Sequence, residues 1–367
     1  MEKTKVLNTV SVEHAGQFMF PESLSQARAE YTEERISDSE LRRVEDDCIR
    51  DLVSSQRLVG IKAITDGGLR QRLWPVDFLC GLSGVSAKTV RSGHVFQDVE
   101  TGVTVPEITG KIEYNPEHPI FADFVFLKSL VAPGETARVA LPAPATTLMW
   151  VLRNASVQNA SETAAQISAA YRATLEHLYG LGCGSVILRD TSWDVFCSVD
   201  GLKRLIQGGL DAEQLPELLR GTNDDALSAL PAGMQKILFV KTECSDTSAI
   251  SRQLYSMIID KILGHGNVDT FMGSEDTILA FIKDASREFP QDKGLIVGVV
   301  DPRHPSLENP EEIAARIRGI YEALHPRSIA VSPADGFFRN RDLYDTSVFT
   351  ERDQWEKLLL LSQVSLS

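Results

Sequence analysis

The fold of this chain is indicated most clearly by the stretch Gly60-Ile-Lys-Ala-Ile-Thr-Asp-Gly-Gly-Leu-Arg-Gln-Arg-Leu-Trp-Pro-Val-Asp-Phe78. It predicts a short buried strand over 61–64 that ends at the polar turn Asp66-Gly67-Gly68. Side chains suited to binding follow in the loop: Arg70, Arg72 and Trp74. In α/β folds, the side chains that carry chemistry gather at the carboxyl ends of parallel strands. An ordinary βα turn is the alternative, since Asp-Gly is a common turn pair.

The same alternation of apolar runs and helical stretches recurs along the chain. The predicted strands are 9–13, 61–64, 138–144, 185–190, 236–242, 268–273, 295–301 and 328–335. The predicted helical stretches include 23–57, 162–179, 249–263, 276–289 and 310–324. Within the first of these, Ser37 and Glu40 have the spacing of a capping box. Continuous apolar strands between helices indicate a parallel sheet covered on both faces.

Eight such βα units in 367 residues predict a TIM-type (β/α)8 barrel rather than an open sheet. We expect one barrel domain over 1–367, with an insertion at about 80–135 that contains a hairpin after the second βα unit. No glycine-rich phosphate loop follows the first predicted strand, so the sequence argues against a dinucleotide-binding unit.

The composition narrows the class of protein. The hydrophobic content of 43% and charged content of 24% are typical of a globular protein, and no apolar run is long enough to span a membrane. The net charge of −14 opposes nonspecific binding to nucleic acid or to anionic membranes. Five cysteines without a C-x-x-C pair, after a charged N-terminus, favour a cytoplasmic protein with free thiols. The oligomeric state stays open, a homo-oligomer included.

The predicted strand ends would bring polar side chains to one mouth of the barrel, where a small-molecule substrate would bind. Carboxylates and imidazole transfer protons, so the candidate catalytic residues are His14, Asp66, Asp190 and Asp335. Guanidinium groups bind anions bidentately. The candidate substrate-binding residues are Gln17, Arg70, Trp74, Arg189, Cys244, Asp301 and His304. Structural explanations compete with these roles: a backbone hydrogen bond for His14, a cap for Asp66, a core position for Cys244 and a surface loop for His304.

Several segments have a sequence typical of one family. They are Glu13-His-Ala-Gly-Gln-Phe18, Ile36-Ser-Asp-Ser-Glu-Leu-Arg-Arg-Val-Glu-Asp46, 64–78, His118-Pro-Ile-Phe-Ala-Asp-Phe-Val-Phe-Leu-Lys128, Gly298-Val-Val-Asp301 and Ile329-Ala-Val-Ser-Pro-Ala-Asp-Gly-Phe337. Together they resemble the cobalamin-independent methionine synthase family, and in particular its short single-barrel members that match the catalytic C-terminal half. The resemblance is collinear over nearly the whole chain and implies the barrel fold.

The resemblance also implies a zinc ion that binds the homocysteine thiol, which then receives a methyl group from N5 of a folate. Four-coordinate zinc takes Cys, His and Asp or Glu ligands. The family's His-x-Cys is Thr242-Glu243-Cys244 here, its Glu falls at Gly273-Ser274, and its Cys-Gly is Asp335-Gly336. Cys244 and Asp335 remain as candidate ligands, and two ligands do not hold a catalytic zinc. A shift of register would instead give the set Glu243, Cys244, Glu275 and Asp335.

The substrate contacts implied by the family differ as well. Its Asp-Gly-Glu is Asp66-Gly67-Gly68, its Gly-Ser is Gly16-Gln17, and its acid after the fourth strand is Arg189. The sequence therefore favours an enzyme of specialised metabolism with a lost zinc site and no cofactor. Its expected chemistry is acid–base catalysis (lyase, isomerase, dehydration or cyclisation) on a small anionic or carbonyl-bearing metabolite. Methyl or alkyl transfer to a thiol at a rearranged metal site, and a non-catalytic binding homologue, are the alternatives.

Overall fold

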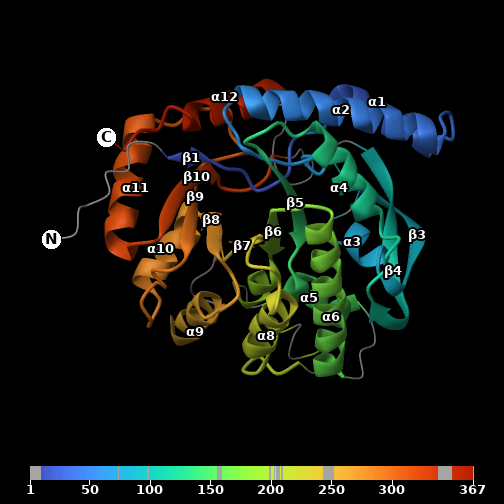
Figure 1. Cartoon of the computed structure of the whole chain (residues 1–367). Helices are drawn as coiled ribbons and strands as arrows, with labels where there is room; N and C mark the ends of the chain where they lie inside the picture. Colours follow the sequence, from blue (N-terminus) through green and yellow to red (C-terminus); the bar gives the residue numbers. More distant parts are fainter. Residues whose placement is uncertain are drawn as a thin grey trace.

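A single curled sheet of eight parallel strands forms the centre of the protein (Figure 1). The computed structural model describes residues 10–72, 74–96, 99–154, 159–197, 200–201, 203, 207, 210–242, 252–337 and 349–366. The eight strands are β1 (Ser11–Val12), β2 (Ala63–Ile64), β5 (Thr136–Pro142), β6 (Ser185–Asp190), β7 (Gln235–Val240), β8 (Thr270–Ser274), β9 (Gly294–Val300) and β10 (Ser328–Pro333).

The strand order is that of a barrel with one unpaired seam. The strands lie in the order β1-β10-β9-β8-β7-β6-β5-β2. The last strand of the chain, β10, therefore pairs with the first, β1, while β1 and β2 at the two edges do not pair. At the seam between β1 and β2, the Phe18 amide donates to the Gly67 carbonyl at 3.0 Å. The arrangement fits the TIM-type barrel expected from the sequence.

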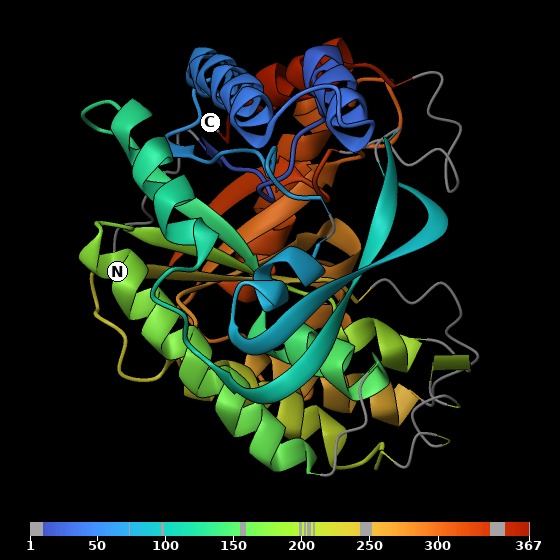
Figure 2. The same cartoon turned by 90° about the vertical axis from the view of Figure 1, so that its right-hand side faces the viewer.

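Helices cover the outer face of the sheet (Figures 1 and 2). They are α1 (Glu22–Thr32), α2 (Asp38–Leu58), α3 (Val76–Cys80), α4 (Pro119–Leu130), α5 (Pro144–Asn154), α6 (Ala160–Gly180), α8 (Leu215–Leu227), α9 (Arg252–Leu263), α10 (Glu275–Lys283), α11 (Pro310–Leu324) and α12 (Glu351–Leu361), with a short 3-10 helix, η1 (Ser192–Cys197). The predicted capping box is confirmed, because the Ser37 side chain accepts from the Glu40 amide at the start of α2. The predicted helical stretch 23–57 is two helices.

A two-stranded antiparallel ribbon lies between β2 and β5 in the sequence. It consists of β3 (Ser83–Phe96) and β4 (Val99–Glu113) and runs along one side of the molecule (Figure 2). Both strands lie within the segment of about 80–135 where the sequence placed an insertion.

The barrel interior is filled with side chains, as expected for a barrel of this size. A buried apolar layer contains Ala15, Ile187, Ile237, Phe239, Met272, Ile296 and Ala330. At the amino end of β5, Arg138 forms an ion pair with Glu13, the residue after β1, and donates from Nε to Ser185 Oγ at 2.9 Å. The opposite, carboxyl end of the strands is the mouth. Among the described residues, no helix is long and apolar enough to cross a membrane.

Candidate active site at the carboxyl ends of the strands

The centre of the mouth holds two cations and one carboxylate from three strand ends. Arg189 is the next-to-last residue of strand β6, and Asp335 follows β10. Arg189 donates from Nη2 to Asp335 Oδ1 at 2.5 Å. Lys241 follows β7, and its Nζ lies 3.5 Å from Asp335 Oδ2. The Gly336 amide also donates to Asp335 Oδ1, at 2.7 Å. Two cations thus lie beside one carboxylate among the described residues, and guanidinium and ammonium groups at strand ends are suited to bind anions.

Two aromatic rings hold the guanidinium group of Arg189. Its Cζ lies 5.2 Å from the ring centroid of Trp74 and 5.2 Å from that of Phe239. The Nε of Arg189 is buried and has no hydrogen-bond acceptor in the described part of the chain. Contact with the two aromatic rings restrains the position of the guanidinium group at the end of β6.

A cavity of about 200 Å³ lies in the split between β2 and β5. These strands pair only at Ala63 with Thr136 and at Ile64 with Ala137, whereas β5 continues to Pro142, so the two chains diverge toward the mouth. Asp66, Arg70 and Trp74 line the cavity from the loop after β2, and residues of β5 and α4 line it from the other side. Trp74 therefore borders both the cavity and the Arg189 cluster.

Asp66 is one of the aspartates that line this cavity, together with Asp77 and Asp123. Burial raises the pKa of Asp66 above its usual range, and the charge of Asp123 adds to the rise, while the hydrogen bond from the Gly68 amide opposes it. That amide donates to Asp66 Oδ1 at 3.0 Å. The turn needs glycine, because Gly67 has φ +68° and a Cβ there would lie 2.3 Å from Leu52 Cδ2. A partly buried carboxyl with a raised pKa that lines a cavity is a candidate for proton transfer.

Buried arginines fix the loop that carries Asp66 and Trp74. Arg28 donates from Nη1 to the Gln71 carbonyl at 3.1 Å and from Nη2 to the Leu69 carbonyl at 2.6 Å. Arg70 pairs with Asp46 of α2, and its Nε lies 3.5 Å from Asp123 of α4. Side chains of α1, α2 and α4 thus hold the loop, which gives the site the rigid support that binding and catalysis require.

His14 is placed at the seam rather than in the mouth. Its Nδ1 accepts from the Gly16 amide at 2.9 Å, so the ring proton sits on Nε2, which donates to Gln56 Oε1 at 3.2 Å. Burial, and then the charge of Arg138, lower the pKa of His14 to about 3. The side chain is only 2% exposed, and both ring nitrogens are occupied. This geometry favours the structural explanation for His14, and we leave it out of the proposed catalytic set.

Asp190 is likewise saturated with hydrogen bonds. Its Oδ1 accepts from the Ser192 amide at 3.0 Å and from Ser192 Oγ at 2.6 Å, and its Oδ2 accepts from Trp193 Nε1 at 2.9 Å and Asn223 Nδ2 at 2.8 Å. Asn223 Nδ2 also lies 3.3 Å from His265 Nε2. Asp190 is fully buried, so it anchors η1 and α8 to the end of β6 instead of facing the mouth.

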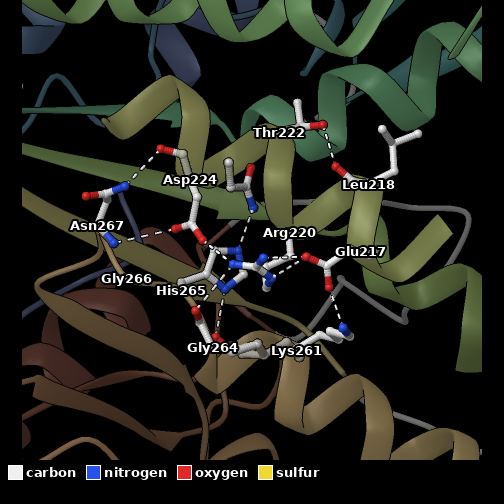
Figure 3. A network of polar contacts seen from close by, with 12 residues as sticks. Glu217, Leu218, Arg220, Thr222, Asp224, Lys261, Gly264, His265, Gly266 and Asn267 are labelled. Atoms are coloured by element: carbon white, nitrogen blue, oxygen red, sulfur yellow. Dashed lines mark hydrogen bonds and ion pairs between the residues drawn. The ribbon is translucent and has the colours of Figure 1, made fainter. Parts of the chain in front are cut away.

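Beyond His265, a polar network ties α8 to the end of α9 (Figure 3). Arg220 forms ion pairs with Glu217 and Asp224, and Glu217 also pairs with Lys261 of α9. These contacts lie behind Asp190 and support its position from outside the barrel.

The remaining predicted residues lie toward the rim or outside the described chain. Asp301, after β9, pairs with Arg303 at 2.8 Å; burial would raise the pKa of Asp301, but the hydrogen bonds from Arg303 outweigh it and lower the pKa. The side chain of His304 is 73% exposed. Gln17 is buried, and its carbonyl accepts from the Phe337 amide at 2.8 Å. Cys244 lies outside the described residues.

One expectation about the cysteines is wrong. Cys48, Cys80 and Cys183 are free, as predicted, but Cys197 at the end of η1 is disulfide-bonded. The sequence gives no sign of this bond because Cys197 belongs to no C-x-x-C pair and the number of cysteines is odd.

The described residues do not fit the zinc site that the family resemblance implies. The carboxylate of Asp335 is engaged by Arg189 and Lys241, whose charges would repel a cation there. Glu275 Oε2 pairs with Arg316 at 2.9 Å. Within the described ranges, no group of three or more His, Cys, Asp or Glu side chains could hold a metal ion. The candidate ligands Glu243 and Cys244 lie outside those ranges.

Comparison with known proteins places the chain among similar barrels. No family model matches it. Two uncharacterized Bacillus subtilis (strain 168) proteins, YxjG and YxjH, are 26% and 25% identical, over 94% of this chain and 91% of their own length. A solved structure from Listeria monocytogenes, named "Putative Vitamin-B12 Independent Methionine Synthase", is 26% identical with a TM-score of 0.73 and covers 98% of both chains.

The chain is similar to cobalamin-independent methionine synthase-like proteins. The resemblance inferred from the sequence is therefore confirmed. A B12-independent methionine synthase from Shewanella sp. W3-18-1, solved in complex with selenomethionine, has a TM-score of 0.68 at 15% identity and covers 97% of this chain and 96% of its own. A methyltransferase from Methanosarcina mazei has a TM-score of 0.55 at 12% identity, covering 96% and 93%. These two likenesses show the fold alone.

In this methionine synthase-like barrel, two positions where the family has site residues carry side chains of opposite charge, and these two side chains contact each other. The family's acid after the fourth strand is Arg189 here, and its zinc-binding Cys is Asp335. The two side chains form the ion pair at the centre of the mouth. Sequence reasoning missed Lys241 as their third partner, although its place directly after the apolar run of β7 was a usable signal.

Proposed function

We propose that this methionine synthase-like barrel is an enzyme of zinc-free acid–base chemistry on a small anionic or carbonyl-bearing metabolite. The reaction would be of the lyase, isomerase, dehydration or cyclisation type. The observation that supports the proposal most strongly is the Arg189–Asp335–Lys241 cluster, because it offers an anion site where the family resemblance implies a metal site.

The roles follow from the positions of the groups. Arg189 and Lys241 hold the anionic group of the substrate, and the rings of Trp74 and Phe239 keep Arg189 in place and exclude water. Asp66 acts as the proton-transfer group. Its carboxylate takes a proton from the carbon beside a carbonyl, and the electron pair of the broken C–H bond moves onto the carbonyl oxygen as an enolate. Return of the proton at another position gives isomerisation, and loss of a leaving group gives elimination.

Binding and proton exchange of small oxo acids test the proposal. Pyruvate, 2-oxobutanoate and acetoacetate are titrated calorimetrically, and exchange of their α-protons in D₂O is followed by NMR. We expect Arg189→Met to weaken binding about tenfold or more, because a hydrogen-bonded charge is lost. We expect Asp66→Asn to bind but not to exchange. Lys111→Met is the control, at a side chain of β4 that is 65% exposed and pairs with Glu113.

Two results would contradict these roles. One is affinity that does not change in Arg189→Met. The other is proton exchange that is absent from the wild-type protein with every acid in the panel, or that persists unchanged in Asp66→Asn.

Methyl or alkyl transfer to a thiol at a rearranged metal site is the second candidate function. The observation that favours it is the 26% identity with the Listeria protein, whose name is that of a methionine synthase. Against it stands the pairing of Asp335 with two cations. A non-catalytic homologue would bind the oxo acids without exchanging their protons.

A further inference from the structure

Two glutamine side chains meet over the Gly68 turn at the seam of the barrel. A Cβ built on Gly68 would lie 3.8 Å from Gln17 Cγ and 3.2 Å from Gln71 Oε1. Gln17 follows β1 and Gln71 follows the turn after β2, so two different strand ends bring these side chains to one point. Because residue 68 is glycine, it has no side chain of its own to fill the space above that turn.

Backbone hydrogen bonds fix the positions from which both glutamine side chains start. The Gln17 carbonyl accepts from the Phe337 amide at 2.8 Å. The Gln71 amide donates to the Gly68 carbonyl at 3.0 Å, and the Gln71 carbonyl accepts from Arg28 Nη1 at 3.1 Å. Anchored backbone of this kind is what a binding site needs to hold its side chains in place.

The side-chain amides of both glutamines keep surface that a ligand can contact. Within the described ranges, neither amide makes a hydrogen bond, although Gln17 is only 9% exposed. Neither belongs to the unpartnered side-chain atoms that are fully buried, so each amide retains accessible surface. Gln71 also lines the β2–β5 cavity, as Asp66 does. Polar groups in such surroundings normally have a partner, which a bound polar ligand would supply.

Gln17 lies between the Arg189 cluster and the turn that carries Asp66. A Cβ built on Gly336 would lie 2.7 Å from Gln17 Cβ and 3.4 Å from Arg189 Nη1. The Gln17 side chain thus begins beside Gly336 and runs toward Gly68. The Gly68 amide in turn donates to Asp66 Oδ1 at 3.0 Å. A substrate that places its anionic group at Arg189 and a C–H bond at Asp66 therefore extends past these amides.

We propose that Gln17 and Gln71 bind a hydroxyl group of the substrate, on the carbon next to the one from which Asp66 takes the proton. A side-chain amide is uncharged and offers both a donor, Nε2, and an acceptor, Oε1, and a hydroxyl group also donates and accepts. An ammonium group favours a carboxylate and a carboxylate favours a cation, and the two amides are neither. The substrate class is then a small hydroxylated oxo acid. The positions of its anionic group and of the transferred proton rest on the function proposed above.

Two oxo acids of equal size and charge test the preference for a hydroxyl group. 4-Hydroxy-2-oxobutanoate and 2-oxopentanoate differ only by a hydroxyl group in place of a methyl group. Their dissociation constants for the full-length protein are measured calorimetrically. We expect the hydroxy acid to bind about tenfold more tightly, because only its hydroxyl group forms hydrogen bonds with the amides.

Variants assign this preference to the two side chains. Gln17→Leu and Gln71→Leu keep a side chain of similar size but remove the amide. Each should reduce the preference for the hydroxy acid to about threefold or less, while the dissociation constant of 2-oxopentanoate stays within about threefold of the wild-type value. Gln26→Leu is the matched control and should keep the full preference, since Gln26 is exposed on α1 and donates to Glu30. Circular dichroism confirms folding, and if Gln17→Leu does not fold, Gln71→Leu decides alone.

Three outcomes would overturn the proposal: equal affinity of the wild-type protein for the two acids, no binding of the hydroxy acid, or a preference that keeps its wild-type value in a folded variant of either glutamine. The proposed function is read separately, from Arg189→Met and Asp66→Asn. If the preference depends on the glutamines but oxo-acid affinity does not depend on Arg189, hydroxyl recognition stands and the anion site fails. If affinity depends on Arg189 and the hydroxyl group adds nothing, the anion site stands and the assignment of the glutamines fails.

Discussion

An aspartate lies at the end of strand β6 and another lies just after strand β2, but the surroundings of the two carboxyl groups differ. Asp190 ends β6 and accepts four short hydrogen bonds from Ser192, Trp193 and Asn223, with no exposed surface. Asp66 follows β2 and accepts from the amide of Gly68, while its carboxyl borders a cavity. The difference lies in what surrounds each carboxyl, since both occupy the positions where barrel enzymes place catalytic groups.

This contrast shows that hydrogen-bond saturation separates a structural strand-end carboxyl from a functional one. A carboxylate whose lone pairs are filled by fixed donors cannot approach a substrate proton without breaking those bonds. A carboxyl that is desolvated but little hydrogen-bonded has a raised pKa, as Asp66 does, and remains free to exchange protons.

Removing the saturated carboxyl should have the largest effect on stability. Asp190→Ala would leave the buried donors of Ser192, Trp193 and Asn223 without an acceptor, each at about 1–3 kcal/mol. We expect a loss of about 3 kcal/mol or more in the free energy of unfolding measured in urea. Asp292→Ala, at a side chain that is 73% exposed, is the control and should change it by less than about 0.5 kcal/mol. Equal effects at the two positions would refute the structural role of Asp190.

The end of β1 sharpens the comparison through His14. Its pKa is lowered to about 3 in the folded protein by burial and by Arg138, so the native state resists a proton that the unfolded state accepts below pH 6.5. Stability from this group is therefore present above pH 6.5 and lost as the pH falls toward 3. Between pH 6.5 and 5 the loss should reach about 2 kcal/mol, relative to His14→Gln. If the stability of the wild-type protein and of His14→Gln changed with pH in the same way, the lowered pKa of His14 would be contradicted.

Replacing Asp66, the carboxyl with few hydrogen bonds, should change the free energy of unfolding less than replacing Asp190, and in the opposite direction. The folded-state pKa of Asp66 is raised, so its contribution to stability is fully present below the unfolded pKa and is lost as the pH rises through the folded one. Asp66→Asn keeps an oxygen to accept from the Gly68 amide and carries no charge. We expect it to stabilise the protein at pH 7 by about 0.5–1 kcal/mol while abolishing exchange. Thermal unfolding at pH 4 and pH 7 measures the difference, and destabilisation at pH 7 would contradict it.

The exposed rim of the mouth should show the smallest effect. His304 is 73% exposed and lies 4.0 Å from Asp301. Surface pairs of this kind contribute little to stability. We expect His304→Ala to change the free energy of unfolding by less than about 0.5 kcal/mol and to leave oxo-acid exchange intact. Loss of proton exchange in this variant would contradict the prediction and would indicate that the reaction takes place nearer to the end of β9.

The sequence predicted the features that depend on neighbouring residues. The turn at Asp66-Gly67-Gly68 and the capping box at Ser37 are local, so their residue types suffice to place them. The barrel order followed from the alternation of apolar strands and helices. These parts of the fold could be predicted because each is determined within one element or by the order of elements.

The roles of the site residues depend on contacts between distant segments. Nothing near Asp190 in the sequence reveals that Asn223 of α8 and Thr146 of α5 donate to its carboxylate. The cavity exists because β2 pairs with β5 over only two residues, which no periodicity shows. The side chains nearest His14 Nε2 are 42 and 51 residues away in sequence, at Gln56 and Thr65. Hydrogen-bond saturation is thus a property of the fold and not of the motif.

The most direct test of the central claim is to measure zinc content and methionine formation on the same purified protein. Zinc is quantified by elemental analysis before and after chelation, and methionine is assayed from homocysteine and a methyl-folate donor. The proposed acid–base site predicts no stoichiometric zinc and no methionine, together with oxo-acid exchange that depends on Asp66. One chelator-sensitive zinc ion per chain with folate-dependent methionine synthesis would contradict it.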